Sequence, residues 1–290
     1  MILLDAIVEK IRQVSGQQLE INHTQAIGGG CINSAMKIVG GGRDYFVKVN
    51  RASLLPMFEA EAEALNLMQQ AAIRVPCPVC CGATEQDSYL VLEYLALSGT
   101  INQDSLGQQL AALHQITDVH YGWHRDNTLG STSQINTRDD NWIRFWQQHR
   151  LGYQLQLAQA NGYSGELQTL GQKLLEQVPG FFSGYSPSPS MLHGDLWGGN
   201  AAALADGTPV IYDPALYYGD RETDLAMTEL FGGFGARFYA AYNEVWPLDA
   251  GYKHRKTLYN LYHILNHLNL FGGGYRQQAM AMMRQLLAAL

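Results

Sequence analysis

Basic residues are scarce in this sequence. Its 290 residues include 19 Lys and Arg against 26 Asp and Glu, which gives a formal net charge of −7. A general nucleic-acid binder needs a basic surface that displaces counterions from phosphates, so this balance argues against a nucleic-acid partner. A locally positive nucleotide pocket remains compatible with the sequence, because such a pocket needs only a few residues.

Cysteines are also few, and long apolar runs are missing. Three of the four cysteines are Cys77, Cys80 and Cys81, and this number does not form the disulfide framework of a small secreted domain. Cys77 and Cys80 have redox-motif or zinc-site spacing, but no second Cys or His pair follows at the distance that a zinc site requires. No window approaches the ~20 apolar residues of a spanning helix, and the N-terminus lacks the pattern of a secretory signal. We therefore expect a cytoplasmic protein with no membrane partner.

The predicted secondary structure differs between the first and the second part of the chain. In the first part, apolar periodicity and helix-forming residues predict helices over 3–14 and 57–70 and strands ending near 27 and over 34–39, 45–49 and 89–92, with Pro78 in a loop. In the second part, helices are predicted over 106–114, 142–160, 167–177, 225–242, 257–270 and 275–290. The sequence thus predicts an α+β chain of two lobes, joined near residues 93–98. The small β-rich N-terminal lobe covers residues 1–95, and the larger, mainly helical C-terminal lobe covers residues 96–290.

The segment from His193 to Asn200 carries the strongest chemical signal. Asp195 and Asn200 lie five residues apart, and Asp213 follows after a predicted turn at 205–207 and a strand at 208–212. In a kinase catalytic loop, an aspartate receives the proton of the substrate hydroxyl, and an asparagine five residues later holds Mg²⁺. A second aspartate, on the next hairpin, bridges the metal to the nucleotide phosphates. The spacing therefore predicts Asp195 as the catalytic residue and Asn200 and Asp213 as metal ligands.

Lys48 is the predicted phosphate-binding cation. It lies in a strand that follows a Gly-rich turn and precedes a helix containing several glutamates. This order is typical of a lysine that grips the α- and β-phosphates while a helix glutamate orients it. Glu61 is the expected partner, with Glu59 and Glu63 as the neighbouring candidates.

The first glycine triplet, Gly28, Gly29 and Gly30, lies between two predicted strands and ahead of Lys48. Glycines there let backbone N–H groups approach phosphates without a Cβ clash, so this turn is predicted to bind nucleotide. Asn33 is expected to stabilise the turn. Cys31 lies beside it and is a candidate for an oxidisable thiol that gates activity.

Trp197, in His-Gly-Asp-Leu-Trp-Gly-Gly-Asn, is the residue that generic kinase chemistry does not require. With this motif in place, the sequence resembles the fructosamine kinase (ketosamine-3-kinase) family, within the aminoglycoside-phosphotransferase-like branch of the protein-kinase-like fold. The likeness runs over nearly the whole chain, and several members have histidine at the position of Asp220. Further matching segments are 29–33, 46–48, 126–127, 149–151, 213–215, 218–224, 261–263 and 265–272.

The resemblance implies an ATP-dependent and Mg²⁺-dependent kinase that phosphorylates the 3-hydroxyl of a small-molecule or protein-bound ketosamine. The products of that reaction fall apart, so the activity reverses protein glycation. For the site, Trp197 is expected to give the sugar or its amine an apolar or cation–π wall, with lobe packing as the alternative. Glu93 and Leu95, at the predicted joint, are expected to contact the nucleotide. His193 and Asp224 are expected to fix the catalytic loop.

Two alternatives remain at the level of sequence. One is another small-molecule kinase of the aminoglycoside or choline kinase type, which we expect to lack Trp197. The other is a non-catalytic pseudokinase that only binds nucleotide. The sequence leaves open whether the protein is a monomer or a homodimer.

Overall fold

The computed structural model describes residues 3–16, 18–28 and 32–289 and divides into two compact units. Unit 1 comprises Met1–Asn102 and Ala201–Pro214, and unit 2 comprises Gln103–Asn200 and Ala215–Leu290. This division differs from the lobes expected at 1–95 and 96–290, because residues 96–102 and 201–214 group with the N-terminal part. The reason is backbone hydrogen bonding: the Ile211 N–H donates to the Arg74 carbonyl, and the Gly99 N–H donates to the Ala203 carbonyl.

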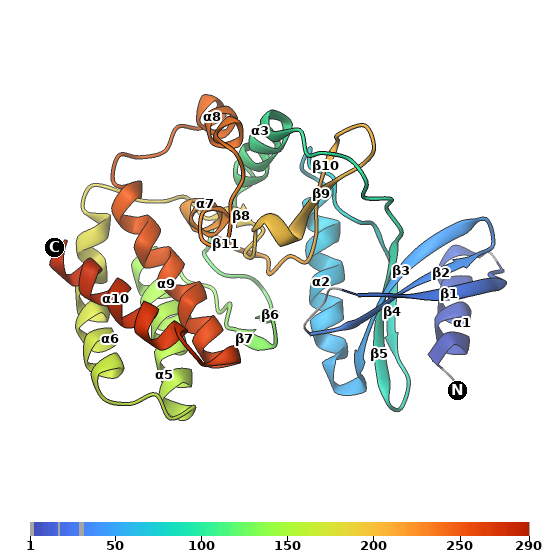
Figure 1. Ribbon diagram of the computed structural model, residues 1–290, viewed down its shortest axis with the longest axis horizontal. Helices are drawn as coiled ribbons and strands as arrows, with labels where there is room; N and C mark the ends of the chain where they lie inside the picture. The colour runs from blue at the N-terminus through green and yellow to red at the C-terminus, as the bar shows by residue number, and fades with distance from the viewer. Residues whose placement is uncertain (1–2, 17, 29–31, 290) are drawn as a thin grey trace. The chain divides into compact units, whose positions relative to one another are not determined.

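Unit 1 is built on a five-stranded antiparallel sheet in the order β1-β2-β3-β5-β4 (Figure 1). Its strands are β1 (Ile21–Ile27), β2 (Ser34–Gly40), β3 (Arg43–Arg51), β4 (Pro78–Ala83) and β5 (Asp87–Glu93). Four of these strands confirm the sequence prediction. The loop predicted around Pro78 is wrong, because this segment forms the edge strand β4, whose first residue is the proline. Proline is tolerated there, since an edge strand need not donate on its outer side.

The two faces of this sheet are covered by different helices, α1 (Leu3–Ser15) and α2 (Leu55–Met68), the latter preceded by η1 (Ala52–Leu54). Ile7 and Ile11 of α1 form a core with Tyr89 and Val91 of β5. Because side chains alternate along a strand, Leu90 and its neighbours on the same face point to the opposite side of the sheet. Each such buried aliphatic side chain contributes about 2 kcal/mol relative to exposure. The sheet is therefore a rigid base for the residues that it carries.

A short hairpin of β9 (Ala201–Ala203) and β10 (Pro209–Ile211) completes unit 1. The predicted strand at 208–212 and the turn before it are confirmed. The Ile211 and Val210 side chains are fully buried. The hairpin ends two residues before Asp213, so its packing holds that residue against unit 1.

Unit 2 is mainly helical, with two short strand pairs. The helices are α3 (Gln103–His114), α4 (Trp142–Phe145), η2 (Trp146–Gly152), α5 (Tyr153–Ala160), α6 (Glu166–Gln177), η3 (Val178–Phe182), η4 (Gly198–Asn200), α7 (Glu222–Thr228), α8 (Ala236–Val245), α9 (Tyr252–Phe271) and α10 (Tyr275–Ala288). The strands are β6 (Asn127–Leu129) with β7 (Thr132–Gln134), and β8 (Ser190–Leu192) with β11 (Tyr217–Gly219). None of these four strands was predicted, because three residues are too few to show a period.

Helix α9 is central to unit 2 and packs against α5, α7 and α10 (Figure 1). Leu258, Leu261, Leu265 and Leu268 recur at helical spacing, and all four are fully buried. The helix ends at Gly272, whose φ of +66° suits a glycine after the last turn. The predicted helix over 257–270 is confirmed.

Two other helix predictions need correction. The helix predicted over 225–242 is wrong: the structure has α7 and α8, separated by a segment that contains Gly232, Gly233 and Gly235. Gly232 has φ +92°, which a helix cannot accommodate. The helix predicted over 142–160 is present but contains η2, a stretch of π-helix in its middle.

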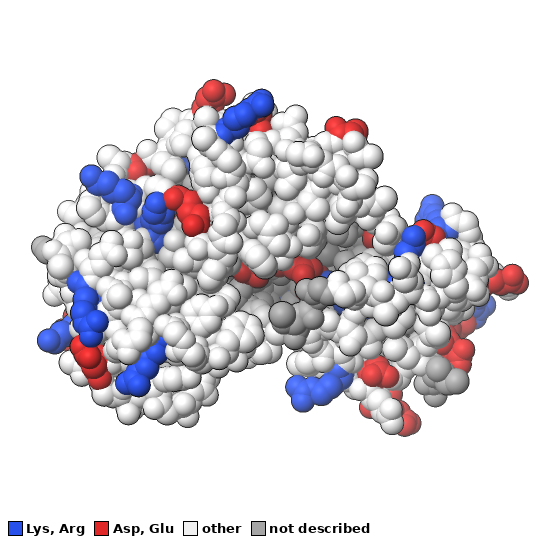
Figure 2. All heavy atoms as spheres, in the orientation of Figure 1, with Lys and Arg blue, Asp and Glu red and all other residues white. Residues whose placement is uncertain are grey.

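The surface carries dispersed charge. On the face shown in Figure 2, the Lys and Arg side chains lie apart from one another, and several adjoin Asp or Glu. Among the described helices, none combines the length and the apolar character needed to cross a membrane.

Candidate functional site

The loop from His193 to Asn200, which the sequence predicts to be catalytic, begins directly after β8 and is held by a buried carboxylate. Asp224, on α7, accepts hydrogen bonds from the backbone N–H groups of His193 (2.7 Å) and Gly194 (2.8 Å). Its Oδ2 also lies 3.0 Å from Nε2 of His114 on α3. Burial acts to raise the pKa of Asp224, but the hydrogen bond from His114 and the nearby His193 outweigh it and lower that pKa below its ordinary value. Asp224 is thus a charged anchor for the loop.

Gly194 makes the sharp turn that presents Asp195. Its φ is +83°, and a Cβ on it would lie 2.1 Å from the Ala215 carbonyl oxygen, so only glycine fits. The Ala215 N–H donates to the His193 carbonyl at 2.8 Å, which ties the loop to the segment before β11. The Asp195 N–H donates to Nδ1 of His193 at 3.2 Å.

Asn200 closes the loop on Asp195. Its Nδ2 donates to the Asp195 backbone carbonyl (2.9 Å) and to Oδ2 of the Asp195 carboxylate (3.2 Å). These two bonds direct the amide nitrogen toward Asp195. The other end of the amide, Oδ1, accepts no hydrogen bond from the described residues and is available to a cation.

Trp197 lies on the outer side of the same loop. Its side chain is 36% exposed, although it is one of the largest apolar groups of the chain. A Cβ on Gly199 would lie 2.3 Å from the Trp197 ring, so the indole lies directly over that glycine. The loop sequence therefore both exposes the indole and fixes its position.

Lys48 forms the centre of the charged group on unit 1. It extends from β3, where it pairs with Ala35 and Leu90, and is 6% exposed. Its Nζ lies 2.5 Å from Oε1 of Glu61 on α2 and 2.5 Å from Oδ1 of Asp213. Burial alone would lower the pKa of Lys48, but the two carboxylates outweigh it and raise that pKa above its ordinary value. Of the three glutamates considered from the sequence, the structure brings Glu61 to Lys48.

Asp213 differs from the other acidic groups of the site in its exposure and backbone. Its side chain is 48% exposed, and its φ of 59° makes it the one non-glycine residue with positive φ in the described part of the chain. Aspartate tolerates this conformation better than most residues, but the conformation still costs free energy. The packed hairpin before Asp213 supplies the constraint that keeps it there.

The glycine turn is described only in part. Gly28 directly follows β1, and a Cβ on it would meet nothing within 4 Å. Gly29, Gly30 and Cys31 lie outside the described residues. Asn33 accepts a hydrogen bond from Nδ2 of Asn50 at 2.7 Å, and the same nitrogen donates to the Ile32 carbonyl. Asn33 is therefore bound to β3 at the end of the turn.

Glu93 and Leu95 lie at the end of β5 and just beyond it. The Glu93 carboxylate accepts from Arg74 (2.7 Å) and from the Cys77 N–H (2.6 Å), so its side chain is occupied within unit 1. Leu95 is half-buried.

On β4, burial raises the pKa of Cys80 to about 12, which makes its thiol a poor nucleophile at neutral pH.

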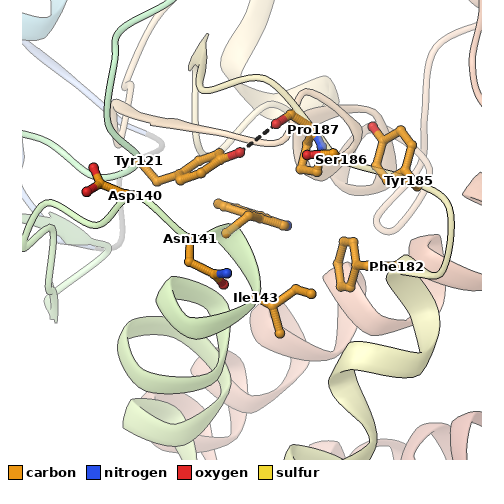
Figure 3. Close-up of a pocket in the computed structure, with 9 residues that line it drawn as sticks. Tyr121, Asp140, Asn141, Ile143, Phe182, Tyr185, Ser186 and Pro187 are labelled. Carbon is orange, nitrogen blue, oxygen red and sulfur yellow. Dashed lines mark hydrogen bonds between the residues drawn. The ribbon is translucent and has the colours of Figure 1, made fainter.

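A separate pocket of about 110 Å³ lies in unit 2 and contains none of the predicted site residues (Figure 3). It is lined by Tyr121, Asp140, Asn141, Trp142, Ile143, Phe182, Tyr185, Ser186 and Pro187. The Tyr185 hydroxyl donates to Asp220, which also accepts from Tyr259 (2.5 Å). Burial raises the pKa of Asp220, against the effect of these hydrogen bonds. Asp220 is thus fully buried and bonded to two tyrosines, one of which, Tyr185, lines the pocket.

Sequence reasoning missed several polar residues around the loop. His114 was given no role from the sequence, yet it contacts Asp224 and the Tyr242 hydroxyl. Gln134 and Arg150 are almost completely buried, and Gln134 donates to the backbone carbonyl of Ala215. A single amide carries no motif, so only a three-dimensional structure could reveal Gln134. Arg150 lies in segment 149–151, which matched the family pattern but received no role.

Comparisons with known proteins show the family of the chain. Residues 3–289 match the sequence model of the fructosamine kinase family. The chain belongs to the fructosamine kinase family. A Synechocystis protein described as a ketoamine kinase is 49% identical, over 97% of this chain and 96% of its own length. A chloroplastic protein-ribulosamine 3-kinase from Oryza sativa subsp. indica is 41% identical, over 97% of this chain and 84% of its own.

Solved structures support the same fold. A Haemophilus somnus protein described as a fructosamine-3-kinase has a TM-score of 0.88 and 32% identity, with 97% of this chain and 96% of the other covered. An APH(2″)-IIa aminoglycoside phosphotransferase, at 16% identity and a TM-score of 0.63, covers 99% of this chain and 96% of its own, and it shows the fold alone. The predicted two-lobed kinase-like fold and the predicted phosphotransferase class are confirmed.

Proposed function

We propose that this fructosamine kinase family member transfers a phosphoryl group from ATP to the 3-hydroxyl of a ketosamine, free or protein-bound. Ribulosamine, erythrulosamine and fructosamine adducts are the candidate acceptors. The family membership and the relatives described as ketoamine kinase and protein-ribulosamine 3-kinase support this substrate class. The expected outcome in the cell is removal of sugar adducts from protein, in the cytoplasm.

The observation that carries the proposal is the fixed geometry of Asp195. The loop backbone before it is bonded to Asp224, and Asn200 bonds both its carbonyl and its carboxylate. Phosphoryl transfer depends on positioning, because its transition state is loose and requires little deprotonation of the nucleophile. In our proposal Asp195 orients the sugar hydroxyl and accepts its proton late in the reaction.

Nucleotide binding is proposed for unit 1. Lys48 carries a fixed positive charge, since Glu61 and Asp213 keep it protonated. Gly28, Gly29, Gly30 and Asn33 would supply backbone N–H groups and a stabilised turn for the phosphates. Main-chain groups at Glu93 and Leu95 are proposed to meet the base.

Asn200 and Asp213 are the proposed Mg²⁺ ligands. Both offer oxygen, which a hard cation prefers: Oδ1 of Asn200 is free of donors among the described residues, and Asp213 is half-exposed. When bound, Mg²⁺ neutralises charge that develops on the phosphates. The residues present therefore fit this ion.

Activity against a panel of acceptors tests the proposal. ATP consumption is measured with ribulosamine, erythrulosamine and fructosamine adducts of a small amine, and with an aminoglycoside and choline. We expect turnover with ketosamines; turnover with only the aminoglycoside or choline would favour that kinase type instead. No turnover with any acceptor, together with nucleotide binding, would favour the pseudokinase.

Asp195→Asn tests the proposed role of Asp195 as the proton acceptor. It should lose about 10³-fold or more in kcat, with an unchanged circular dichroism spectrum, because the proton acceptor and its charge are removed. Asp140→Asn is the control, since Asp140 is an 80% exposed carboxylate outside the proposed site. Turnover retained in Asp195→Asn would refute the assignment of the base.

A further inference from the structure

Three amide side chains, two of them buried, form a continuous network beside the loop of Asp195. Asn127 and Gln134 are direct cross-strand partners in the β6–β7 hairpin, and Asn136 lies two residues further on. Gln134 is 1% exposed and Asn136 is completely buried. Oδ1 of Asn127 accepts from Nε2 of Gln134 and from Nδ2 of Asn136, both at 2.9 Å. A fully bonded polar network in a buried setting fixes its own geometry.

Arg150 fixes the orientation of the amide groups in this network. It lies in the π-helical stretch η2, is completely buried, and its guanidinium stacks 4.0 Å from the Tyr217 ring. None of the ion pairs among the described residues includes it. Instead it donates to Oδ1 of Asn136 (2.8 Å) and to the Ile135 carbonyl (2.6 Å). Because a guanidinium can only donate, Asn136 must turn its oxygen to Arg150 and its nitrogen to Asn127.

The orientation of the Asn127 and Gln134 amides is fixed in turn, and each donates to a backbone carbonyl. Since Oδ1 of Asn127 already accepts two hydrogen bonds, its Nδ2 faces the other way and donates to the Leu216 carbonyl at 2.8 Å. Oε1 of Gln134 accepts from the Tyr262 hydroxyl (2.9 Å), so its Nε2 donates to the Ala215 carbonyl at 2.9 Å. Both amides therefore present N–H groups to adjacent residues of one segment.

That segment lies against the catalytic loop. The Ala215 N–H bonds the His193 carbonyl, and the Ala215 oxygen occupies the space that a Cβ of Gly194 would need. Asp195 is the next residue. A rotation of the Ala215 peptide would therefore displace Gly194 and, with it, Asp195.

We infer that Gln134 is a positioning residue for Asp195, which acts through the carbonyl of Ala215, while Arg150 and the linked asparagines fix the orientation of its amide. The inference rests on the proposed role of Asp195. Gln134 is buried, so its effect passes through Ala215 and does not require contact with substrate.

Gln134→Leu tests the inference, because it keeps much of the volume and removes the amide. For a free ribulosamine, kcat should fall by about 10- to 100-fold, as expected for a small displacement of a positioned group. KM for the ribulosamine and for ATP should stay within about threefold, because binding groups are untouched. Gln168→Leu is the matched control, since Nε2 of Gln168 also bonds two carbonyls, those of Leu155 (3.0 Å) and Tyr163 (2.9 Å). It should lose stability and keep kcat.

Amide hydrogen exchange gives a readout that does not depend on turnover. Exchange in residues 193–196 should be faster in Gln134→Leu and unchanged in Gln168→Leu. If Gln134→Leu does not fold, Tyr262→Phe takes its place, because it removes only the hydroxyl that donates to Oε1 of Gln134. It should give a smaller loss of kcat with unchanged KM.

A folded variant with kcat within about twofold of the wild type, or an equal loss of kcat in Gln168→Leu, would overturn the inference. If the wild-type protein does not turn over ketosamines, the proposed function fails. The exchange comparison then still decides whether Gln134 positions the loop.

Discussion

At the scale of single residues, Trp197 is the residue for which we propose a contact with the substrate. Its indole is held over Gly199 and is 36% exposed, which suits a wall for the sugar or its amine better than a packing role. We expect Trp197→Ala to raise KM for the ketosamine about tenfold and to leave KM for ATP nearly unchanged, because stacking of this kind contributes on the order of 1 to 2 kcal/mol. Steady-state kinetics with each substrate varied in turn measures both constants.

A matched control for Trp197→Ala is Trp123→Phe, since Trp123 is 3% exposed and belongs to the core. It should lower stability and leave both KM values unchanged. Equal increases in the two KM values of Trp197→Ala would show that Trp197 only packs.

Where a motif constrained them, residues that the sequence predicts to act together are neighbours in the structure. Asn200 bonds Asp195, and Lys48 contacts Glu61 and Asp213, while the roles of these residues stay predictions. Gln134 and Arg150 could not be predicted in the same way, because their partners are backbone carbonyls and amides from distant segments. Gly29, Gly30 and Cys31 lie outside the described residues, so the redox role of Cys31 stays a prediction.

The pair α3 and α8 illustrates how elements support the site. Gly107 of α3 lies against α8 so closely that a Cβ would be 2.3 Å from the Phe238 carbonyl oxygen. Gly107→Ala should therefore lower the free energy of unfolding by about 1 to 2 kcal/mol, although alanine favours an isolated helix by about 1 kcal/mol. Urea denaturation measures the change. Gly274→Ala is the control, because its Cβ would meet nothing within 4 Å, and a stabilised Gly107→Ala would contradict the packing.

Helix α9 should make the stability of unit 2 depend on pH through His263. Burial, with a smaller effect of His267, lowers the pKa of His263 to about 3, and its Nδ1 has no partner among the described residues. The unfolded chain takes up a proton below pH ~6.5, whereas the folded chain does so only near 3. Its contribution to stability is therefore fully present above pH ~6.5 and is lost as the pH falls toward 3.

Between pH 7 and pH 5 this residue should account for a loss of about 2 kcal/mol in the free energy of unfolding. The difference between wild type and His263→Gln, measured by urea denaturation at both pH values, isolates it from the carboxylates. His254→Gln, at an exposed histidine of the same helix, should behave as wild type. An equal pH dependence in wild type and His263→Gln would contradict the buried neutral state.

Long periodic elements were predictable, and short or interrupted ones were not. Helix α9 and strand β3 show a clear period, whereas β6, β8 and β11 have three residues each and depend on tertiary pairing. The break between α7 and α8 was missed because the apolar pattern of 225–242 continues across the three glycines that interrupt the helix. The π-helical stretch η2, which contains Arg150, was not predicted from the sequence.

At the scale of the whole molecule, the division into units does not follow chain order. Residues 201–214 belong to unit 1, although they lie between two segments of unit 2. Asn200 ends the first segment of unit 2, and Asp213 lies one residue before the end of the following segment of unit 1. Sequence reasoning assumed a single joint near 93–98, because composition changes there, and it had no signal for this exchange.

If the two units have separate cores, destabilising one should leave the other intact. Ile211, on β10 of unit 1, and Leu265, on α9 of unit 2, are both completely buried. Truncation of either to alanine should cost about 2 to 4 kcal/mol. Hydrogen exchange with peptide resolution should then be faster over β3 and β5 in Ile211→Ala, and over α5 and α9 in Leu265→Ala, since local stability follows cooperative units. Faster exchange throughout the chain in both variants would mean that the molecule unfolds as one unit.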